Sequence, residues 1–204
     1  MRAVIIAGGS ITDHQGMREL IKPSDFVVCA DYGYAHAQRM GIHIDAVIGD
    51  FDSLGYVPQH ENLRVLPIKK DMTDTQSAID YARDKGYKDF LLMACTGTRM
   101  DHTLANILLL RTMPERGESG CMVDEHNRIY VLQQRIAVEG FAGATLSLIP
   151  LEDCYGITTQ DLEYPLYNAY IPMGSTLGIS NVMLKDTACV TLTKGMMLLI
   201  IARD

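Results

Sequence analysis

The pattern of apolar residues changes once along this chain, near residues 125–127, and that change limits the folds open to it. Before this point, short apolar runs typical of strands alternate with segments of helical character. The runs lie at residues 3–7, 26–30, 46–48, 64–68, 90–94 and 120–123. Such alternation predicts an α/β N-terminal domain at residues 1–125, with a mostly parallel sheet covered by helices on both faces.

The helix with the strongest sequence signals lies at residues 75–85. Thr73 and Gln76 fit a capping box at its start, and Gly86 supplies a stop after its end. The apolar residues at positions 78, 79 and 82 form a stripe that we expect to face the sheet.

A second helix is expected at residues 102–111. Asp101 stands at the N-cap position, where a carboxylate can accept hydrogen bonds from the first turn. Leu104, Ala105, Leu108 and Leu109 are expected to face inward.

Beyond Asp124 the helical periodicity disappears. Short β-type runs follow at residues 129–132, 136–138, 145–149, 155–159, 182–184, 188–192 and 196–201, separated by Gly, Pro, Asn and Asp. This spacing predicts an antiparallel sandwich or small barrel. We therefore expect an all-β antiparallel sandwich as the C-terminal domain, at residues 126–204.

Composition excludes several classes of function. The chain has 204 residues and a formal net charge of −7, so we expect no broad binding of nucleic acid or of anionic membranes. Its five cysteines are far apart and form no Cys-x-x-Cys pair, which indicates reduced thiols. The N-terminus lacks the pattern of a signal peptide, and no apolar stretch approaches the ~20 residues that span a bilayer. We expect a cytoplasmic protein.

Acidic residues gather after several of the strand-like runs of the first domain. Carboxylates at the ends of neighbouring strands repel one another unless a cation neutralises them, so the pattern indicates a divalent metal with a polyanion. A guanidinium in the third cluster adds a planar group suited to phosphate oxygens. Together they suggest nucleotide phosphates held by magnesium and an arginine. The clusters are Asp50 with Asp52, Asp71 with Asp74, and Arg99 with Asp101.

Each cluster also has a purely structural explanation. Asp50 and Asp52 fit a solvated turn, and Asp74 fits an acidic helix start stabilised by the helix dipole. Arg99 could be a surface arginine beside the helix cap of Asp101, and Asp101 could cap its helix while presenting a free oxygen to metal or substrate.

Two glycine-containing turns fit the same picture. Gly8 and Gly9 end the first strand, as expected for a loop that lets a nucleotide approach the backbone. Gly97 lies in a strand-to-helix turn, where backbone N–H groups favour phosphate. The Gly8-Gly9 turn carries neither a dinucleotide nor a P-loop fingerprint. Asp31 ends the second strand.

Motifs along nearly the whole chain resemble those of the thiamine pyrophosphokinase family, in the same order. In the first domain they are Ala30-Asp31-Tyr32-Gly33, Gly49-Asp50-Phe51-Asp52-Ser53, Lys70-Asp71-Met72-Thr73-Asp74 and residues 97–106. Residues 163–166, 174–181 and 195–203 resemble the second domain of bacterial members. Tyr32 departs from the family pattern, which often has glycine or arginine there.

The resemblance implies roles for these residues. Asp50, Asp52 and Asp71 would bind Mg²⁺, while Asp74 would fix the local site or the nucleotide. Gly8, Gly9, Asp31, Gly97 and Arg99 would contact ATP, and Asp101 would position or deprotonate the acceptor hydroxyl. Ser180 and Asn181 resemble the motif that recognises thiamine, although a β-turn cap explains the same pair.

The expected activity is transfer of the pyrophosphoryl group of ATP to thiamine, giving thiamine diphosphate and AMP. The family likeness also implies a homodimer with thiamine between subunits. Two alternatives remain open: a magnesium-dependent phosphohydrolase using the same aspartates, and a non-catalytic sensor of nucleotide or thiamine.

Overall fold

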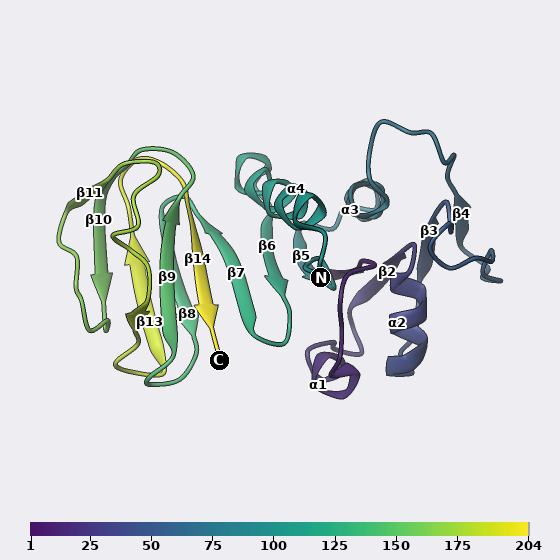
Figure 1. Cartoon of the computed structure of the whole chain (residues 1–204), viewed down its shortest axis with the longest axis horizontal. Coiled ribbons are helices and arrows are strands. Elements are labelled where there is room, and N and C mark those ends of the chain that lie inside the picture. The colour runs from purple at the N-terminus through teal and green to yellow at the C-terminus, as the bar shows by residue number, and fades with distance from the viewer. Residues whose placement is uncertain (204) are drawn as a thin grey trace. The chain divides into compact units, whose positions relative to one another are not determined.

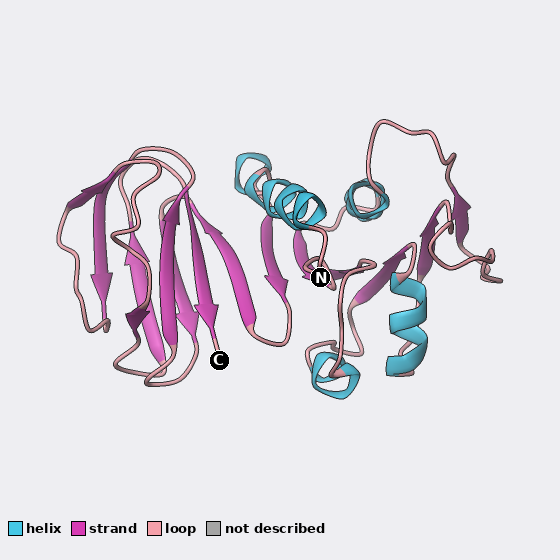
Figure 2. Ribbon diagram, in the orientation of Figure 1, coloured by secondary structure: helices cyan, strands magenta, loops and turns pink. Residues whose placement is uncertain are grey.

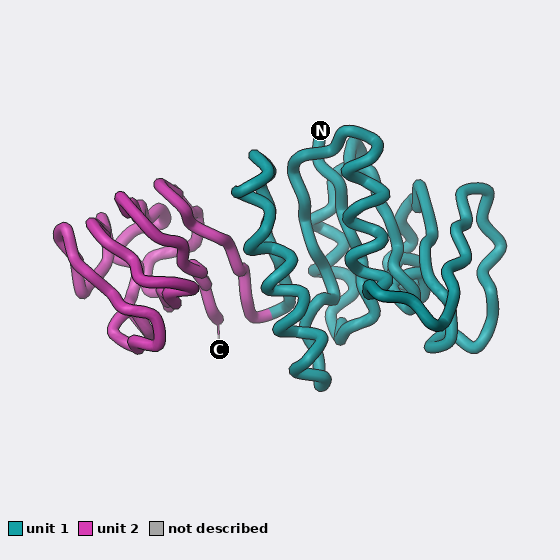
Figure 3. The backbone as a smooth tube through the Cα atoms, turned by 90° about the horizontal axis from the view of Figure 1, so that it is seen from above, with its two compact units in different colours: residues 1–125 teal, residues 126–204 magenta. Residues whose placement is uncertain are grey.

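The chain divides into two compact units, the first ending at Glu125 and the second beginning at His126 (Figure 3). The computed structural model describes residues 1–203. The first unit is an α/β domain and the second an antiparallel β domain, which confirms the expected fold class. Within the described residues, no helix has the length and apolar character needed to cross a membrane.

The first unit carries six strands, four helices and one short 3₁₀ turn. They are β1 (Arg2–Ile6), α1 (His14–Glu19), β2 (Phe26–Ala30), α2 (Gly33–Met40), β3 (Ala46–Gly49), β4 (Leu63–Val65), α3 (Asp74–Asp84), β5 (Asp89–Met93), α4 (Met100–Arg111), η1 (Pro114–Arg116) and β6 (Ser119–Val123).

These strands form a parallel sheet in the order β6-β5-β1-β2-β3-β4. Helices α3 and α4 cover one face and α1 and α2 the other (Figure 1). Strand β1 lies between β2 and β5, with Ile5 opposite Val28 and Leu92. All three side chains are fully buried, as expected for strands covered on both faces.

Helix α3 follows its sequence signals closely. The hydroxyl of Thr73 accepts a hydrogen bond from the backbone N–H of Gln76 (3.2 Å), and Gly86 follows the helix with φ +90°. Ala78, Ile79 and Ala82 are fully buried. The apolar stripe therefore faces the sheet, as predicted.

Helix α4 differs from its prediction in two ways. It begins two residues earlier, at Met100, with Arg99 at the N-cap, so Asp101 lies in the first turn and is not the cap. The prediction of its inward face was also wrong. Leu104 and Leu108 are each 55% exposed, while Asn106 and Leu110 are buried. The amide of Asn106 donates to the carbonyl of Cys95 (2.9 Å) and holds that side of the helix against the end of β5.

Over its described residues, 126–203, the second unit has strands joined by loops and no helix (Figure 2). They are β7 (Asn127–Leu132), β8 (Arg135–Glu139), β9 (Thr145–Pro150), β10 (Cys154–Gln160), β11 (Ala169–Ile171), β12 (Asn181–Val182), β13 (Thr187–Thr191) and β14 (Met197–Ala202). They form two antiparallel layers, in the orders β12-β9-β14-β7 and β11-β10-β13-β8.

The alternation of buried and half-buried residues along β9 is typical of a strand with one face in a core. Leu146 and Leu148 of β9 pack in one cluster with Ile157 and Val190 of the other layer. The two layers therefore share a sandwich core. Among the described strands of this unit, β11 alone lies where no apolar run was predicted.

Candidate active site

A cavity of about 710 Å³ opens at the carboxyl ends of the parallel strands. In open α/β sheets this edge is where ligands bind. Nine of the predicted site residues line the cavity, and they come from five separate loops. They are Gly8, Gly9, Asp31, Asp50, Asp52, Asp71, Asp74, Gly97 and Arg99.

Three carboxylates lie closest together in this cavity. Asp31, Asp50 and Asp74 each offer an oxygen within 4.8 Å of the other two. The family resemblance had assigned magnesium to Asp50, Asp52 and Asp71. Asp52 and Asp71 line the same cavity but are exposed and stand outside this closest group. The cluster has the chemistry of a divalent-cation site, because hard cations prefer carboxylate oxygens.

Asp31 has an unfavourable environment for a carboxylate. Its Oδ2 accepts a hydrogen bond from the hydroxyl of Ser53 (2.6 Å), but its Oδ1 is buried without a hydrogen-bond partner. Burial raises the pKa of Asp31, and the negative charges of Asp74, Asp52 and Asp50 raise it further. A bound cation would satisfy this oxygen and favour the ionised form.

Lys70 is the nearest positive charge to the cluster, and it was not among the predicted site residues. Its ammonium lies 2.5 Å from Oδ2 of Asp50 and 2.9 Å from Oδ1 of Asp74. The second contact is an ion pair, and it is the one close partner of the buried Oδ1 of Asp74. The hydrogen bond from Lys70 lowers the pKa of Asp50.

The backbone is strained just after the ends of three strands, on the side of the sheet where the cavity lies. Asp31 after β2, Phe51 after β3 and Ala94 after β5 have φ values of +50°, +62° and +53°. Residues other than glycine seldom adopt this left-handed conformation, which is enriched at functional sites. The turns aim Asp31 and Asp50 toward the same space.

The Gly8-Gly9 loop is held tightly against the end of β5. The N–H groups of Gly9 and Ser10 donate to the carbonyls of Ala94 (2.7 Å) and Thr96 (3.0 Å). A Cβ on Gly9 would lie 2.2 Å from the oxygen of Thr96, closer than any side chain tolerates. Glycine is thus required here by contact between two loops of the protein, as well as leaving room for a ligand.

A buried histidine also fixes this loop. His36 places Nε2 2.8 Å from the carbonyl of Gly9 and Nδ1 3.1 Å from Nε2 of His14. Because a carbonyl only accepts, His36 donates from Nε2, and its Nδ1 accepts from His14. Burial lowers the pKa of His36, which favours this neutral form. Nothing in the sequence marked His36, since it stands alone in an ordinary helix.

Arg99 and Asp101 form an exposed pair beside the cavity. The guanidinium of Arg99 approaches Asp101 through Nη2 (2.5 Å) and Nε (3.2 Å). These hydrogen bonds lower the pKa of Asp101, which makes its carboxylate a weaker base. Arg99 lines the cavity and is 69% exposed, so it can turn toward an anionic ligand. Asp101 is better suited to orienting Arg99 than to removing a proton.

Cys95 is the cysteine that lines the cavity. Burial raises its pKa to about 12, so the thiol is protonated at neutral pH and is unsuited to nucleophilic attack.

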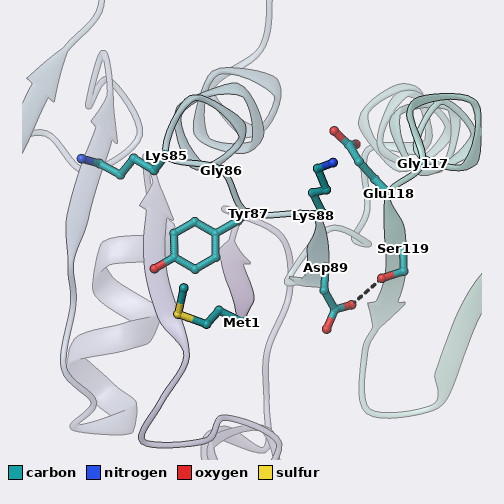
Figure 4. A pocket seen from close by; sticks show the side chains of 9 residues that line it. All are labelled: Met1, Lys85, Gly86, Tyr87, Lys88, Asp89, Gly117, Glu118 and Ser119. Atoms are coloured by element: carbon teal, nitrogen blue, oxygen red, sulfur yellow. Dashed lines mark hydrogen bonds between the residues drawn. The ribbon is translucent and has the colours of Figure 1, made fainter.

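A second hollow, of about 540 Å³, lies at the opposite, amino ends of β1 and β5 (Figure 4). Its acidic residues already have partners. Asp89 accepts a hydrogen bond from the hydroxyl of Ser119 (2.8 Å), and Glu118 pairs with Arg83 (2.8 Å). The acidic groups of this hollow are therefore already paired within the protein.

Ser180 and Asn181 lie in the second unit, around the start of β12. The side chain of Asn181 is bonded on both sides to Tyr164: Oδ1 accepts from its N–H (3.0 Å) and Nδ2 donates to its carbonyl (2.8 Å). Asn181 is only 8% exposed. It therefore holds the Tyr164 segment, and its predicted contact with thiamine stays a prediction.

The chain thus combines an α/β unit, with an acidic cavity at the carboxyl ends of its parallel strands, and a β-sandwich. Residues 17–121 match the family model described as thiamin pyrophosphokinase, catalytic domain, and residues 130–197 match the vitamin B1 binding domain of the same enzymes. The chain belongs to the thiamine pyrophosphokinase family, and it is an enzyme of that class.

Individual relatives agree with the family models. A thiamine pyrophosphokinase of Bacillus subtilis is 31% identical over 183 residues, which cover 85% of this chain and 86% of that protein. The crystal structure of thiamine pyrophosphokinase from Bacillus subtilis aligns over the whole of both chains, with a TM-score of 0.87 and 27% identity. The enzyme from Geobacillus thermodenitrificans aligns over 100% of this chain and 98% of its own, with a TM-score of 0.86 and 28% identity.

Proposed function

We propose that this chain binds ATP in the cavity of its first unit and transfers the pyrophosphoryl group from there to thiamine. The hydroxyl oxygen of thiamine would attack the β-phosphorus, the bond from that phosphorus to the α-phosphate oxygen would break, and AMP would leave. The observation that carries this proposal is the convergence of three carboxylates and two glycine turns at one edge of the parallel sheet.

The donor set fits a magnesium ion. Asp31, Asp50 and Asp74 would hold it, because they offer closely spaced carboxylate oxygens, one of which is buried without a partner. Mg²⁺ bound there would offset the charge that develops on the transferred phosphates. Asp52 and Asp71 lie on the wall of the same cavity, and they would act through water molecules of the ion.

The protein's own groups would orient the nucleotide. Backbone N–H groups of the turn at Gly97, at the start of α4, favour phosphate, and Arg99 supplies a planar fork beside them. The Gly8-Gly9 loop is held in place by β5 and by His36, so it presents a fixed wall. Such positioning accounts for most of the catalysis in phosphoryl transfer.

The acceptor would be recognised by the second unit, through Ser180 and Asn181. Asn181 has one N–H hydrogen beyond its bond to Tyr164, and Ser180 is exposed. We further propose a cytoplasmic homodimer, on the strength of the family likeness and the reduced cysteines.

The deciding experiment is to incubate the protein with ATP, Mg²⁺ and thiamine and to identify the products by mass. We expect thiamine diphosphate and AMP in equal amounts. Release of inorganic phosphate or pyrophosphate without thiamine diphosphate would indicate a phosphohydrolase, and binding without turnover would indicate a sensor. Asp50→Asn serves as the control, because it removes a carboxylate from the cluster and should nearly abolish turnover.

A further inference from the structure

Lys70 lies inside the acidic cluster and not on its rim. Its side chain is only 14% exposed, and its ammonium contacts Asp50 and Asp74, two of the three clustered carboxylates. Lys69, the next residue, is exposed. One of two adjacent lysines is therefore built into the site.

The ammonium and a divalent cation need the same oxygens. Oδ1 of Asp74 is a buried carboxylate oxygen whose close partner is the ammonium of Lys70, at 2.9 Å. Oδ1 of Asp31, in the same cluster, is buried without a hydrogen-bond partner. A cation that satisfies both oxygens would stand close to the ammonium, and like charges a few ångströms apart repel strongly where water is scarce.

We propose that Lys70 is an exchangeable counter-ion, which neutralises Asp50 and Asp74 and leaves them when a divalent cation binds. This inference rests on the metal site of the proposed function. A residue that orients metal ligands stays bound to the carboxylates while the cation is present. Lys70, by contrast, would leave them.

The displaced ammonium would have an obvious new partner. Lys70 lines the cavity, where the phosphates of the nucleotide would be the nearest free anions. A nucleotide that draws Lys70 away would thereby strengthen cation binding, and the cation would strengthen nucleotide binding by the same factor. The site would then fill with both together.

The test is a titration of the metal-depleted protein with Mn²⁺ alone, in which electron paramagnetic resonance measures Mn²⁺ binding. Lys70→Met removes the competing charge but keeps most of the side-chain volume, and we expect Mn²⁺ to bind about ten- to a hundredfold more tightly. Lys69→Met is the matched control, because it makes the same charge change at an exposed position. Unchanged or weaker Mn²⁺ binding in Lys70→Met would overturn the inference.

A second measurement uses the wild-type protein, in case Lys70→Met does not fold. Acetylation of lysines, followed by peptide mass analysis, is compared with and without Mg²⁺ in the absence of nucleotide. We expect Mg²⁺ to increase the labelling of Lys70 relative to Lys69, and equal or reduced labelling would contradict the exchange. Formation of thiamine diphosphate by the wild type is assayed separately, so failure of this inference leaves the proposed function standing.

Discussion

Asp31 combines three features that oppose folding. Its backbone is left-handed, its side chain is half buried, and one carboxylate oxygen has no hydrogen-bond donor. Three other carboxylates nearby raise its pKa in addition to burial. Residues of this kind persist where function needs them, because stability and activity are selected together.

We predict that Asp31→Asn stabilises the protein while weakening cation binding. Asparagine tolerates a left-handed backbone, can still accept from Ser53, and carries no charge. With chelator present, the melting temperature of the variant should exceed that of the wild type at pH 7. With Mg²⁺ present, the wild type should gain more than the variant.

The same change should alter the pH dependence of stability. Because the folded pKa of Asp31 is raised, folding binds a proton at this site, and that stabilisation is present at low pH and lost as pH rises through the folded pKa. Melts at increasing pH should show this loss in the wild type and not in Asp31→Asn. Glu61→Gln, which also removes one exposed negative charge but at a residue outside the cavity, is the control and should leave both effects unchanged.

His36 offers a second prediction for a single residue. His36→Phe keeps a ring but removes the hydrogen bonds to Gly9 and His14, so the Gly8-Gly9 loop should become less ordered. Loss of the buried hydrogen bonds should lower the free energy of unfolding by about 1–3 kcal/mol. ATP affinity should fall severalfold in calorimetric titrations with a non-hydrolysable analogue.

Substitution of His14, the hydrogen-bond partner of His36, provides the comparison for this prediction. His14→Phe leaves the bond between His36 and Gly9 intact, so it should affect ATP binding less. If ATP affinity in a folded His36→Phe variant equals that of the wild type, the loop does not depend on His36.

Among the elements, α3 connects local stability to the site. Thr73 caps the helix, and Asp74 is its first residue. Thr73→Ala should lower the free energy of unfolding by about 1 kcal/mol and weaken Mn²⁺ binding as Asp74 loses its fixed position. Chemical denaturation and Mn²⁺ titration measure the two effects.

Thr73→Ser separates the cap from the methyl group. Serine keeps the hydroxyl that accepts from Gln76, so cation binding should return to the wild-type value. Weak binding in the serine variant would point to lost packing of the methyl group, and the cap would not be the cause.

The elements were predictable to different degrees for a physical reason. The stripe of α3 has polar residues on its other side, so one face alone could be buried. In α4 the run from Leu108 to Leu110 is apolar on every side, and its orientation depends on the bond of Asn106 to β5. A tertiary contact of this kind leaves no periodic signal in the sequence.

The site was predicted as a set of loops and not as a geometry. The acidic motifs and glycine turns were all expected at strand ends, and their predicted site residues line one cavity, with the exception of Asp101. Which carboxylates come closest depends on strand order, since β2 and β3 are neighbours and bring Asp31 beside Asp50. Lys70 and His36 act through contacts that only the folded chain creates.

For the molecule as a whole, the proposed homodimer predicts that two inactive variants restore activity to each other. If thiamine binds between subunits, Asp50→Asn and Asn181→Ala should each be inactive at low thiamine concentration, yet partly active when co-expressed. Random pairing gives half heterodimers with one intact site each, so about a quarter of wild-type activity should return.

Analytical ultracentrifugation supplies the control for that experiment. A dimer without recovered activity would mean that each subunit holds a complete site, and a monomer would contradict the homodimer proposal. Asn181→Ala must also be shown to be folded, because it leaves two backbone groups of Tyr164 unpaired.

The overall architecture was the most predictable level. The change of apolar pattern near residue 125 separates helix-containing from strand-only sequence, and this difference depends on periodicity alone. Strand β11 escaped prediction because only one of its residues, Ala169–Ile171, is buried, so the sequence shows no apolar run there.

The placement of β1 has a consequence for how the protein is made in the cell. β1 is synthesised before the other strands of its sheet, yet it lies between β2 and β5, and β5 begins only at Asp89. A nascent chain shorter than this carries an almost wholly apolar strand with one edge unpaired. The aspartates after β2 and β3 are already synthesised at that stage, but the wall supplied by the end of β5 is not. Molecular chaperones therefore have most to protect while residues 1–88 wait for the strand that closes the sheet.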